Sequence, residues 1–327
     1  MKAFVTGGTG FIGSHLVNHL LDQQIDVVCL ARSRSKANRV FADRIPELII
    51  GDMENTEALE AGCSGTDVVF HLAGIIAARS EAEFFRTNAE ATRKLARAAA
   101  NQSSLSRILY VSSLAAAGPT RRGFVVSDPS ASDPVTDYGR SKLAGEDALR
   151  GSTLPWTIVR PPAVYGPGDR ELLRVFKLAR LGIIPIFGDG SQELSLVHAK
   201  DLARAILAAA VHGSRNTTYY PAHREIVTSR QLVETIFRAV KRRETGSPRL
   251  IKIPHGLGRL VLQVTGAAAK LTGQTTILSP DKGAEFFAPA WTCDPSKLED
   301  DTGWAAEYDA ARGIAETTDW YRSQRWL

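Results

Sequence analysis

The sequence contains only three cysteines in 327 residues, Cys29, Cys63 and Cys293, and none stands in a Cys-x-x-Cys or Cys/His spacing. An odd number of widely separated cysteines is typical neither of a disulfide framework nor of a zinc site. We therefore expect reduced, structural thiols, a cytoplasmic location and no bound metal.

The sequence also lacks an uncharged apolar run of the roughly 20 residues that a membrane-spanning helix needs. Its most apolar stretch, residues 257–278, is interrupted by Arg259 and Lys270. The first strand pattern begins next to residue 1 and leaves no room for a signal peptide. We expect no integral membrane segment, and this stretch by itself does not indicate a role at a membrane surface.

Charge of one sign does not dominate the sequence. Forty Lys and Arg face 35 Asp and Glu, for a net charge of +5, and the two signs are interleaved. Basic residues are dense only at residues 32–36 and 241–243. Because short basic runs are usually solvated, we expect no nucleic-acid partner.

A hydrophobic content of 44% and a charged content of 23% are typical of a soluble globular protein. Short, nearly continuous apolar runs predict strands that are buried on both faces. They alternate with helical patterns, which predicts an α/β fold with a doubly wound parallel sheet of the Rossmann type. The expected strands are residues 3–6, 26–30, 48–50, 68–72, 108–111 and 156–159, and the expected helices are 11–21, 81–101 and 138–150.

This alternation breaks after Pro161 and Pro162. Residues 164–169 are expected to form a loop, with helices at 172–181 and 202–211 and short mixed elements beyond. We predict a dinucleotide-binding domain at residues 1–165, with a returning segment near 194–212, and a smaller C-terminal lobe at 166–327 that mainly binds substrate.

Gly7, Gly10 and Gly13 lie between the first strand and the first helix. Glycine weakens both kinds of element, so a benefit must offset this cost. At such a crossover, glycines permit a tight turn and the close approach of a pyrophosphate to the amino end of the helix. A tight turn without a ligand is the alternative for these glycines alone.

Further motifs follow in a specific order. The spacing TGxxGxxG at residues 6–13 precedes two serines at the end of a strand and a YxxxK pattern at Tyr138 and Lys142. Over nearly the whole chain, the sequence resembles the extended short-chain dehydrogenase/reductase family, which includes sugar-nucleotide epimerases and dehydratases, and above all its 3β-hydroxysteroid dehydrogenase-like or dihydroflavonol reductase-like branch.

The resemblance implies an enzyme with a nicotinamide cofactor and a small-molecule substrate. It also implies a homodimer that could form through the helices at residues 81–101 and 138–150. The cofactor-binding positions that we carry over are Gly7, Gly10, Phe11, Ile12, Gly13, Arg32, Asp52, Met53, Leu72, Ala73, Gly74, Asn88, Val111, Tyr138, Lys142, Pro161 and Val164.

Tyr138 and Lys142 are four residues apart in a predicted helix and therefore share one face. A nearby ammonium favours the phenolate form and lowers the pKa of a tyrosine from about 10, so Tyr138 could exchange a proton with an alcohol or carbonyl oxygen. The family places a catalytic hydroxyl at Ser113, and Ser112 is its competitor. An incidental Tyr–Lys pair on an exposed helix is the alternative.

The cofactor is expected to be NADP rather than NAD. An acidic residue at the end of the second strand commonly binds the ribose 2′-hydroxyl of NAD. Here Ala31 occupies that position and Arg32 follows. No carboxylate there repels a 2′-phosphate, and a guanidinium suits one. An ordinary basic loop with NAD bound through other contacts is the alternative.

Three functions compete: a dehydrogenase or reductase of a secondary alcohol or ketone, a sugar-nucleotide epimerase or dehydratase, and a non-catalytic regulator. Tyr138 and Lys142 disfavour the regulator. Related dehydratases carry an Asp–Glu pair where this chain has Leu114 and Ala115, and residues 160–163 are closer to the reductase branch. We favour the reductase and keep the epimerase as the alternative. The sequence does not identify the substrate, nor whether the loop at residues 119–134 meets it.

Overall fold

The computed structural model describes residues 1–42, 44–272, 276 and 280–327. Its main sheet has seven strands in the order β10-β6-β5-β4-β1-β2-β3, and every neighbouring pair is parallel. The strands are β1 (Lys2–Thr6), β2 (Asp26–Ala31), β3 (Glu47–Ile50), β4 (Val68–His71), β5 (Arg107–Val111), β6 (Trp156–Val159) and β10 (Thr217–Tyr219). The predicted doubly wound parallel sheet is confirmed, and strand order reverses between β1 and β4.

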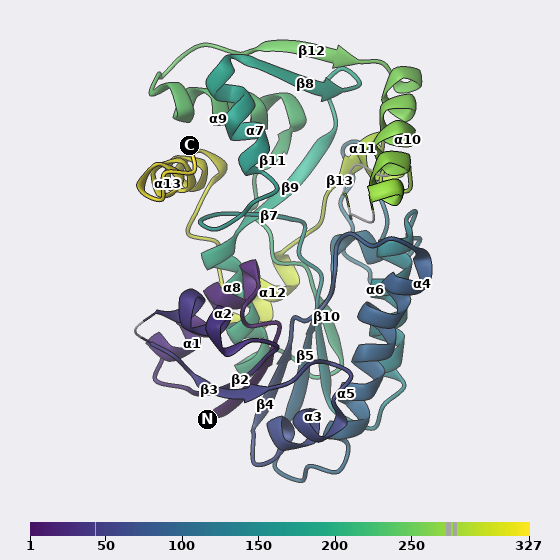
Figure 1. Ribbon diagram of the computed structural model, residues 1–327, viewed down its shortest axis with the longest axis vertical. Coiled ribbons are helices and arrows are strands. Elements are labelled where there is room, and N and C mark those ends of the chain that lie inside the picture. The colour runs from purple at the N-terminus through teal and green to yellow at the C-terminus, as the bar shows by residue number, and fades with distance from the viewer. Residues whose placement is uncertain (43, 273–275, 277–279) are drawn as a thin grey trace.

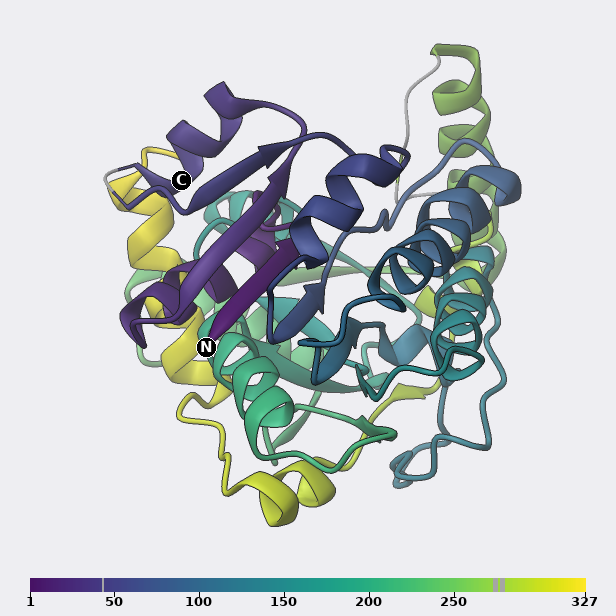
Figure 2. The same cartoon turned by 90° about the horizontal axis from the view of Figure 1, so that it is seen from below.

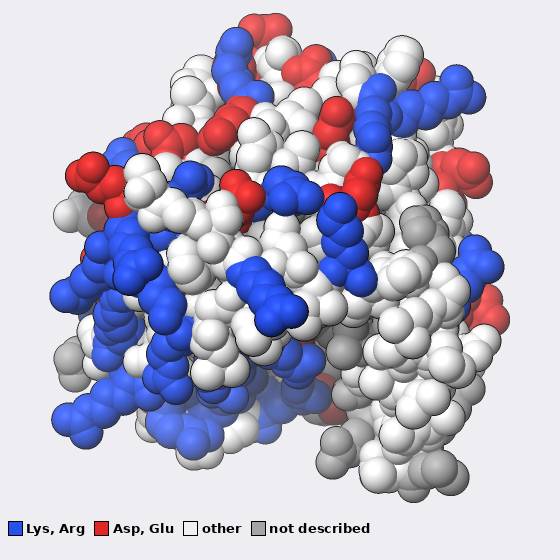
Figure 3. Space-filling view, turned by 90° about the horizontal axis from the view of Figure 1, so that it is seen from above, with Lys and Arg blue, Asp and Glu red and all other residues white. Residues whose placement is uncertain are grey.

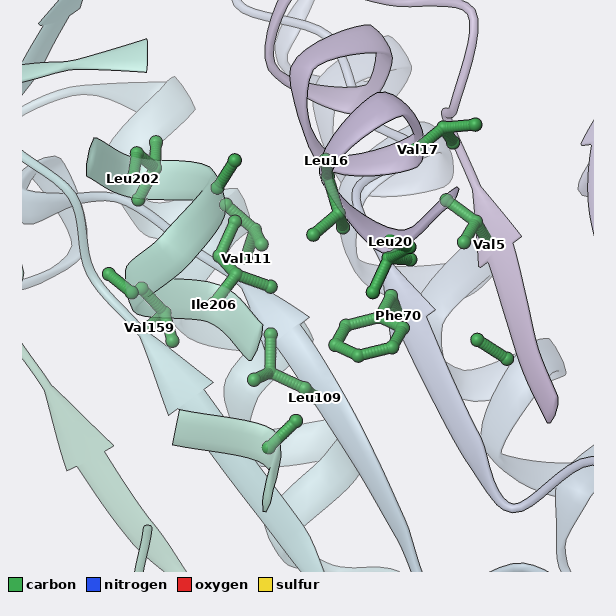
Figure 4. Close-up of a cluster of buried hydrophobic side chains, with 14 of the residues drawn as sticks. Val5, Leu16, Val17, Leu20, Phe70, Leu109, Val111, Val159, Leu202 and Ile206 are labelled. Atoms are coloured by element: carbon green, nitrogen blue, oxygen red, sulfur yellow. The ribbon is translucent and has the colours of Figure 1, made fainter. Parts of the chain in front are cut away.

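Helices cover both faces of this sheet (Figure 2). On one face, Leu16 and Leu20 of α1 (Phe11–Asp22) and Ile206 of α8 (Ala199–Val211) pack on Phe70 and Leu109 (Figure 4). On the other, α3 (Thr56–Cys63), α5 (Ala91–Ala99) and α6 (Asp137–Arg150) cover the alternate strand residues. Successive side chains of each strand point alternately into the two clusters, so nearly every residue of the strand is apolar.

The structure corrects several expected elements. Residues 164–169 are not all loop, because β7 (Ala163–Tyr165) pairs in parallel with β9 (Glu193–His198). The expected helix at 81–101 is α4 (Glu81–Phe84), a π-helical stretch (Phe85–Glu90) and α5 in succession. The short helix α2 (Arg34–Phe41) was not expected, because only Ala37 and Phe41 of its side chains are buried.

Most of the remaining elements form a second lobe at the carboxyl ends of the main strands (Figure 1). They are α7 (Leu173–Leu181), β8 (Ile183–Phe187), β11 (Ile226–Thr228), α9 (Ser229–Lys241), β12 (Arg249–Ile253), α10 (His255–Thr272), α11 (Gly283–Phe286), β13 (Ala290–Trp291) and α13 (Ala310–Ser323). α12 (Ser296–Thr302) instead packs against α8 and the core of the main sheet. Likewise, α8 and β10 return to the main sheet, where α8 packs beside α1 and β10 pairs with β6.

Two sequence expectations concern the whole molecule. None of the helices in the described part of the chain combines the length and hydropathy that crossing a bilayer requires. Cys29, Cys63 and Cys293 are buried as free thiols, and burial raises the pKa of each to about 12. The cysteines are therefore structural, as expected.

Candidate active site

The glycine turn after β1 has no room for side chains. Gly7 has a φ of +75°, and a Cβ on it would lie 2.6 Å from the backbone nitrogen of Ala73. A Cβ on Gly13 would lie 2.2 Å from the Gly7 carbonyl oxygen. The backbone amide of Gly10 donates to that same oxygen at 2.9 Å. The three glycines therefore allow α1 to start tightly against β1 and the end of β4.

This turn leaves the amino end of α1 open to an anion. Phe11 and Ile12 are the first residues of the helix. Its N-cap position is Gly10, and no side chain of the described residues forms a capping hydrogen bond there. The first turn also carries no acidic residue. Unpaired backbone amides and the positive end of the helix dipole bind phosphate. The cradle therefore fits the pyrophosphate of a dinucleotide.

Arg32 and Asp52 follow neighbouring strands. The backbone amide of Gly51 donates to the Ala31 carbonyl at 3.1 Å, which places the end of β3 beside the end of β2. Arg32 is exposed and forms no ion pair with the described residues. Asp52 accepts a hydrogen bond from the amide of Glu54 at 2.9 Å. The two side chains thus stand at one edge of the sheet, where an adenosine could bind.

The segment after β4 lies against the glycine turn. The amide of Leu72 donates to the Thr6 carbonyl at 3.0 Å, and that of Ala73 to the Thr6 hydroxyl at 3.4 Å. A Cβ on Gly74 would lie 2.8 Å from Oδ1 of Asn88 and 3.8 Å from Nζ of Lys142. Gly74 therefore lies between the glycine turn and α6, the helix that carries Tyr138 and Lys142.

Asn88 holds this junction together from within the π-helical stretch. Its Oδ1 accepts from the amide of Ile75 at 2.9 Å, and its Nδ2 donates to the Ile75 carbonyl at 3.1 Å and to Oγ of Ser141 at 2.9 Å. One buried amide thus links the loop after β4 to α6. The family resemblance identified Asn88 in the sequence, whereas its partners could not be predicted.

The structure distinguishes the two candidate serines. Ser113 lies close enough to Tyr138 to lower the pKa of the tyrosine, and the Ser113 hydroxyl accepts from the amide of Ala115 at 3.1 Å. Ser112 instead donates to Oε1 of Glu146 at 2.5 Å, inside the protein. Ser113 is therefore the serine that lies beside Tyr138, while Ser112 is occupied in the core.

Lys142 lies below Tyr138 on the same face of α6. Its Nζ donates to the carbonyl of Val111 at 2.7 Å and lies 4.2 Å from the ring centroid of Tyr110. Burial lowers the pKa of Lys142 to about 7, and the charge of Glu146 opposes that shift. The Lys142 ammonium group therefore titrates near neutral pH.

The expected lowering of the Tyr138 pKa is not found. Burial raises the pKa of Tyr138 to about 12, and among its neighbours only Ser113 acts to lower it. Loss of hydration penalises the phenolate more than neighbouring groups favour it. At neutral pH the Tyr138 hydroxyl is therefore protonated and able to donate.

The remaining predicted positions lie where the main sheet joins the second lobe. Met53, after β3, packs against the core cluster below α3. The carbonyl of Pro161 accepts from the amide of Leu114 at 2.9 Å, and Val164 lies opposite Val197 in the β7–β9 pair. The structure thus brings the predicted positions to one edge of the sheet, at the ends of its strands.

No pattern in the sequence indicates that the segment carrying α11 contacts the candidate tyrosine. Nζ of Lys282 lies 4.5 Å from the ring centroid of Tyr138. The hydroxyl of Thr136 donates to Glu285 at 2.9 Å, and the amide of Asp137 donates to Asp281 at 3.0 Å. These contacts join positions more than 140 residues apart, which no local pattern reveals.

A second unpredicted feature is a buried ion pair beneath the site. Nε and Nη2 of Arg160 donate to the two carboxylate oxygens of Glu146, at 2.8 and 2.7 Å. Both side chains are fully buried, and the Tyr220 hydroxyl accepts a further hydrogen bond from Arg160 at 2.8 Å. Glu146 stands one helical turn after Lys142, which was the only sequence signal for it.

Comparison with known proteins shows the same fold in enzymes. A ceramide reductase of Caulobacter vibrioides is 32% identical over 327 residues, 99% of this chain and 95% of that protein. A 4-hydroxy-2-methyl-3-oxo-4-farnesyl-3,4-dihydroquinoline-1-oxide ketoreductase of Stigmatella aurantiaca is 31% identical over 67% of both chains. A UDP-glucuronic acid 4-epimerase of Bacillus cereus, solved with NAD, superposes with a TM-score of 0.79 at 21% identity, over 99% of this chain and all of that one.

These similarities agree with the chemistry of the site. The protein is an enzyme of the extended short-chain dehydrogenase/reductase type that uses a nicotinamide cofactor. The model of the NAD dependent epimerase/dehydratase family matches residues 3–220. The chain belongs to the NAD dependent epimerase/dehydratase family.

Proposed function

We propose that this enzyme reduces a ketone on a lipophilic substrate to a secondary alcohol with NADPH. The observation that carries the proposal is that Ser113 lies beside Tyr138, one helical turn from Lys142, whose Nζ reaches Gly74 at the end of β4. The names of the two reductase relatives, one a reductase of ceramide and the other of a compound with a farnesyl group, support the substrate class.

In this proposal, bound NADPH supplies a hydride to the carbonyl carbon. The glycine turn and the amino end of α1 hold its pyrophosphate, and the junction around Asn88 and Lys142 receives the nicotinamide end. The hydroxyls of Ser113 and Tyr138 hold the carbonyl oxygen. As that oxygen gains negative charge, Tyr138 donates its proton, and the product is the alcohol.

The protonation state of Tyr138 favours this direction. With its pKa raised to about 12, the phenol is a proton donor throughout the neutral range. The charge of Lys142, whose pKa burial lowers to about 7, would stabilise the phenolate that remains after the transfer. Proton donation to a ketone therefore needs no prior ionisation of the tyrosine.

A dehydratase fits the site poorly. Leu114 and Ala115, which directly follow Ser113, are buried apolar residues. Neither can act as the acid or base that elimination of water requires. An epimerase needs little beyond Tyr138, Ser113 and a retained cofactor, so it is the alternative that experiment must separate.

The function is tested by supplying purified enzyme with NADPH and a panel of ketones, and following the absorbance of NADPH. We expect net oxidation with ketones that carry long alkyl chains and none with UDP-sugars. Interconversion of UDP-sugars by enzyme that retains its dinucleotide, without oxidation of added NADPH, would support the epimerase instead.

We further propose that Arg32 selects NADPH through its 2′-phosphate. Replacing Arg32 with alanine should raise the KM for NADPH about 10- to 100-fold, since a charged hydrogen-bonded contact contributes about 1.5–3 kcal/mol. The KM for NADH should stay nearly unchanged. Arg39→Ala, at the exposed far end of α2, is the matched control. Equal or tighter binding of NADH by the unmodified enzyme would refute the preference.

We also propose a homodimer, which the family resemblance implies, and a cytoplasmic location, which the cysteine pattern implies. Light scattering of the purified protein tests the first, and a mass of 35.4 kDa would contradict it.

A further inference from the structure

Helix α10 in the second lobe has two apolar faces, and the first of them is packed. Gly258, Leu262 and Gly266 lie four residues apart along it. A Cβ on Gly258 would lie 2.5 Å from the Phe287 ring, and one on Gly266 would lie 2.7 Å from Pro280. Leu262 is 1% exposed. This face joins α10 to the segment that carries α11.

The second face of α10 is exposed. Leu257, Leu260, Val261 and Val264 are 53%, 54%, 37% and 60% exposed. Their spacing places them in one stripe, roughly opposite the packed face. A surface helix normally presents charged or polar residues there. Four neighbouring large apolar side chains on solvent therefore indicate a binding surface.

The exposed apolar surface continues onto the neighbouring strands. β12 pairs in parallel with β8, with Ile251 opposite Pro185 and Arg249 opposite Ile183. All four are exposed, so they share the outer face of this two-stranded sheet. α10 follows directly after β12, at the same end of the molecule (Figure 1). We call the exposed face of α10 and this sheet face the tip surface.

Basic residues border the tip surface on one side, where α7 and α9 lie. Residues 173–188 and 238–264 contain ten Lys and Arg but a single acidic residue, Glu244. Nine of these cations form no ion pair with the described residues: Lys177, Arg180, Arg238, Lys241, Arg242, Arg243, Arg249, Lys252 and Arg259. Figure 3, seen from this end, shows blue side chains gathered on one side and a largely uncharged area on the other.

We propose that the tip surface docks on an anionic lipid bilayer. The apolar stripe of α10 would enter the boundary between headgroups and acyl chains, and the cations would contact anionic headgroups. A second copy of the chain fits less well, because a symmetric contact would bring two basic clusters together. A nucleic acid would match the cations but would leave the apolar stripe exposed.

The tip surface leads to the candidate active site. α11 is packed against α10, and Lys282 at its start lies over the Tyr138 ring. A lipid ketone held in the bilayer could therefore approach the site at the end of α10. This last step rests on the proposed function, whereas docking on the bilayer does not.

Co-sedimentation with vesicles tests the proposal. The full chain should bind vesicles made of phosphatidylcholine and phosphatidylglycerol. Its binding to vesicles of phosphatidylcholine alone should be at least tenfold weaker. Leu260→Asp with Val264→Asp should lower binding to the mixed vesicles at least tenfold. A triple change of Lys241, Arg242 and Arg243 to serine should remove most of the dependence on phosphatidylglycerol. Val211→Asp, which alters an exposed apolar residue on α8, is the matched control and should bind normally.

Absence of binding to the mixed vesicles would overturn the proposal. Equal losses in the Val211→Asp control and the α10 variant would also overturn it, as would a dimer that dissociates in the α10 variant without any vesicle binding. Turnover of a short, water-soluble ketone should be the same in all variants and the unmodified chain. An enzyme that binds vesicles but reduces no ketone would refute the proposed function alone.

Discussion

Replacing Tyr138 with phenylalanine should reduce kcat for ketone reduction about 1,000-fold or more while the Kd for NADPH stays nearly unchanged. The substitution removes one hydroxyl, which is the group that we expect to donate a proton to the substrate oxygen. A positioned proton donor contributes about 10²- to 10⁴-fold to a rate. This hydroxyl also lies beside Ser113, the second expected contact to the oxygen, so the substitution disturbs both contacts.

The comparison uses steady-state kinetics and a fluorescence titration of NADPH on the same preparations. Tyr308→Phe is the matched control, because it removes a tyrosine hydroxyl that stands beside Lys200 and Glu316 rather than in the candidate site. It should retain nearly full activity. Activity of the Tyr138 variant within tenfold of the unmodified enzyme would show that another group supplies the proton.

Glu146→Ala should destabilise the protein by about 3–5 kcal/mol, because it leaves a buried charge without its partner. Arg160 is fully buried and donates two hydrogen bonds to Glu146, and Ser112 donates a third. Without Glu146, the guanidinium at 0% exposure keeps the hydroxyls of Tyr220 and Ser132 as partners but no opposite charge. Urea unfolding monitored by circular dichroism measures the free energy of unfolding.

The neighbouring residue provides the control for this prediction. Asp147 pairs with Arg150 at 3.0 Å, but its side chain is 65% exposed. Asp147→Ala should therefore cost less than about 1 kcal/mol. Similar free energies of unfolding for the two variants would mean that the Glu146–Arg160 pair does not stabilise this part of the fold.

The sequence predicted the parts of the site that depend on local spacing. The glycine turn follows from Gly7, Gly10 and Gly13 between a strand and a helix. Tyr138 and Lys142 share a face because they are four residues apart. The parallel sheet follows from short apolar runs that alternate with helices, since such strands are buried on both faces.

The parts that depend on long-range contacts could not be predicted. Glu146 and Arg160 each occur in an ordinary local context, and only the packing of α6 against β6 brings them together. Lys282 reaches Tyr138 through α11, which no pattern near either residue reveals. The pKa of Tyr138 was predicted in the wrong direction, because spacing shows the neighbouring ammonium but not the degree of burial.

The short helices show a different limit. α2 buries Ala37 and Phe41 alone, so its sequence lacks the apolar periodicity that identifies longer amphipathic helices. Residues 164–169 contain glycine and proline and were expected to form a loop, yet Val164 and Tyr165 pair with β9. A partner strand some 30 residues away decided this pairing, and the local composition did not.

Transfer of deuterium tests the central claim most directly. The enzyme is mixed with a long-chain ketone and NADPH that carries deuterium at both C4 positions, and the alcohol is analysed by mass spectrometry and NMR. We predict a single deuterium on the carbinol carbon for each NADPH oxidised, and formation of this labelled alcohol about 1,000-fold or more slower with the Tyr138→Phe variant. A product without deuterium, or a substrate rearranged with no oxidation of the added NADPH, would contradict the account.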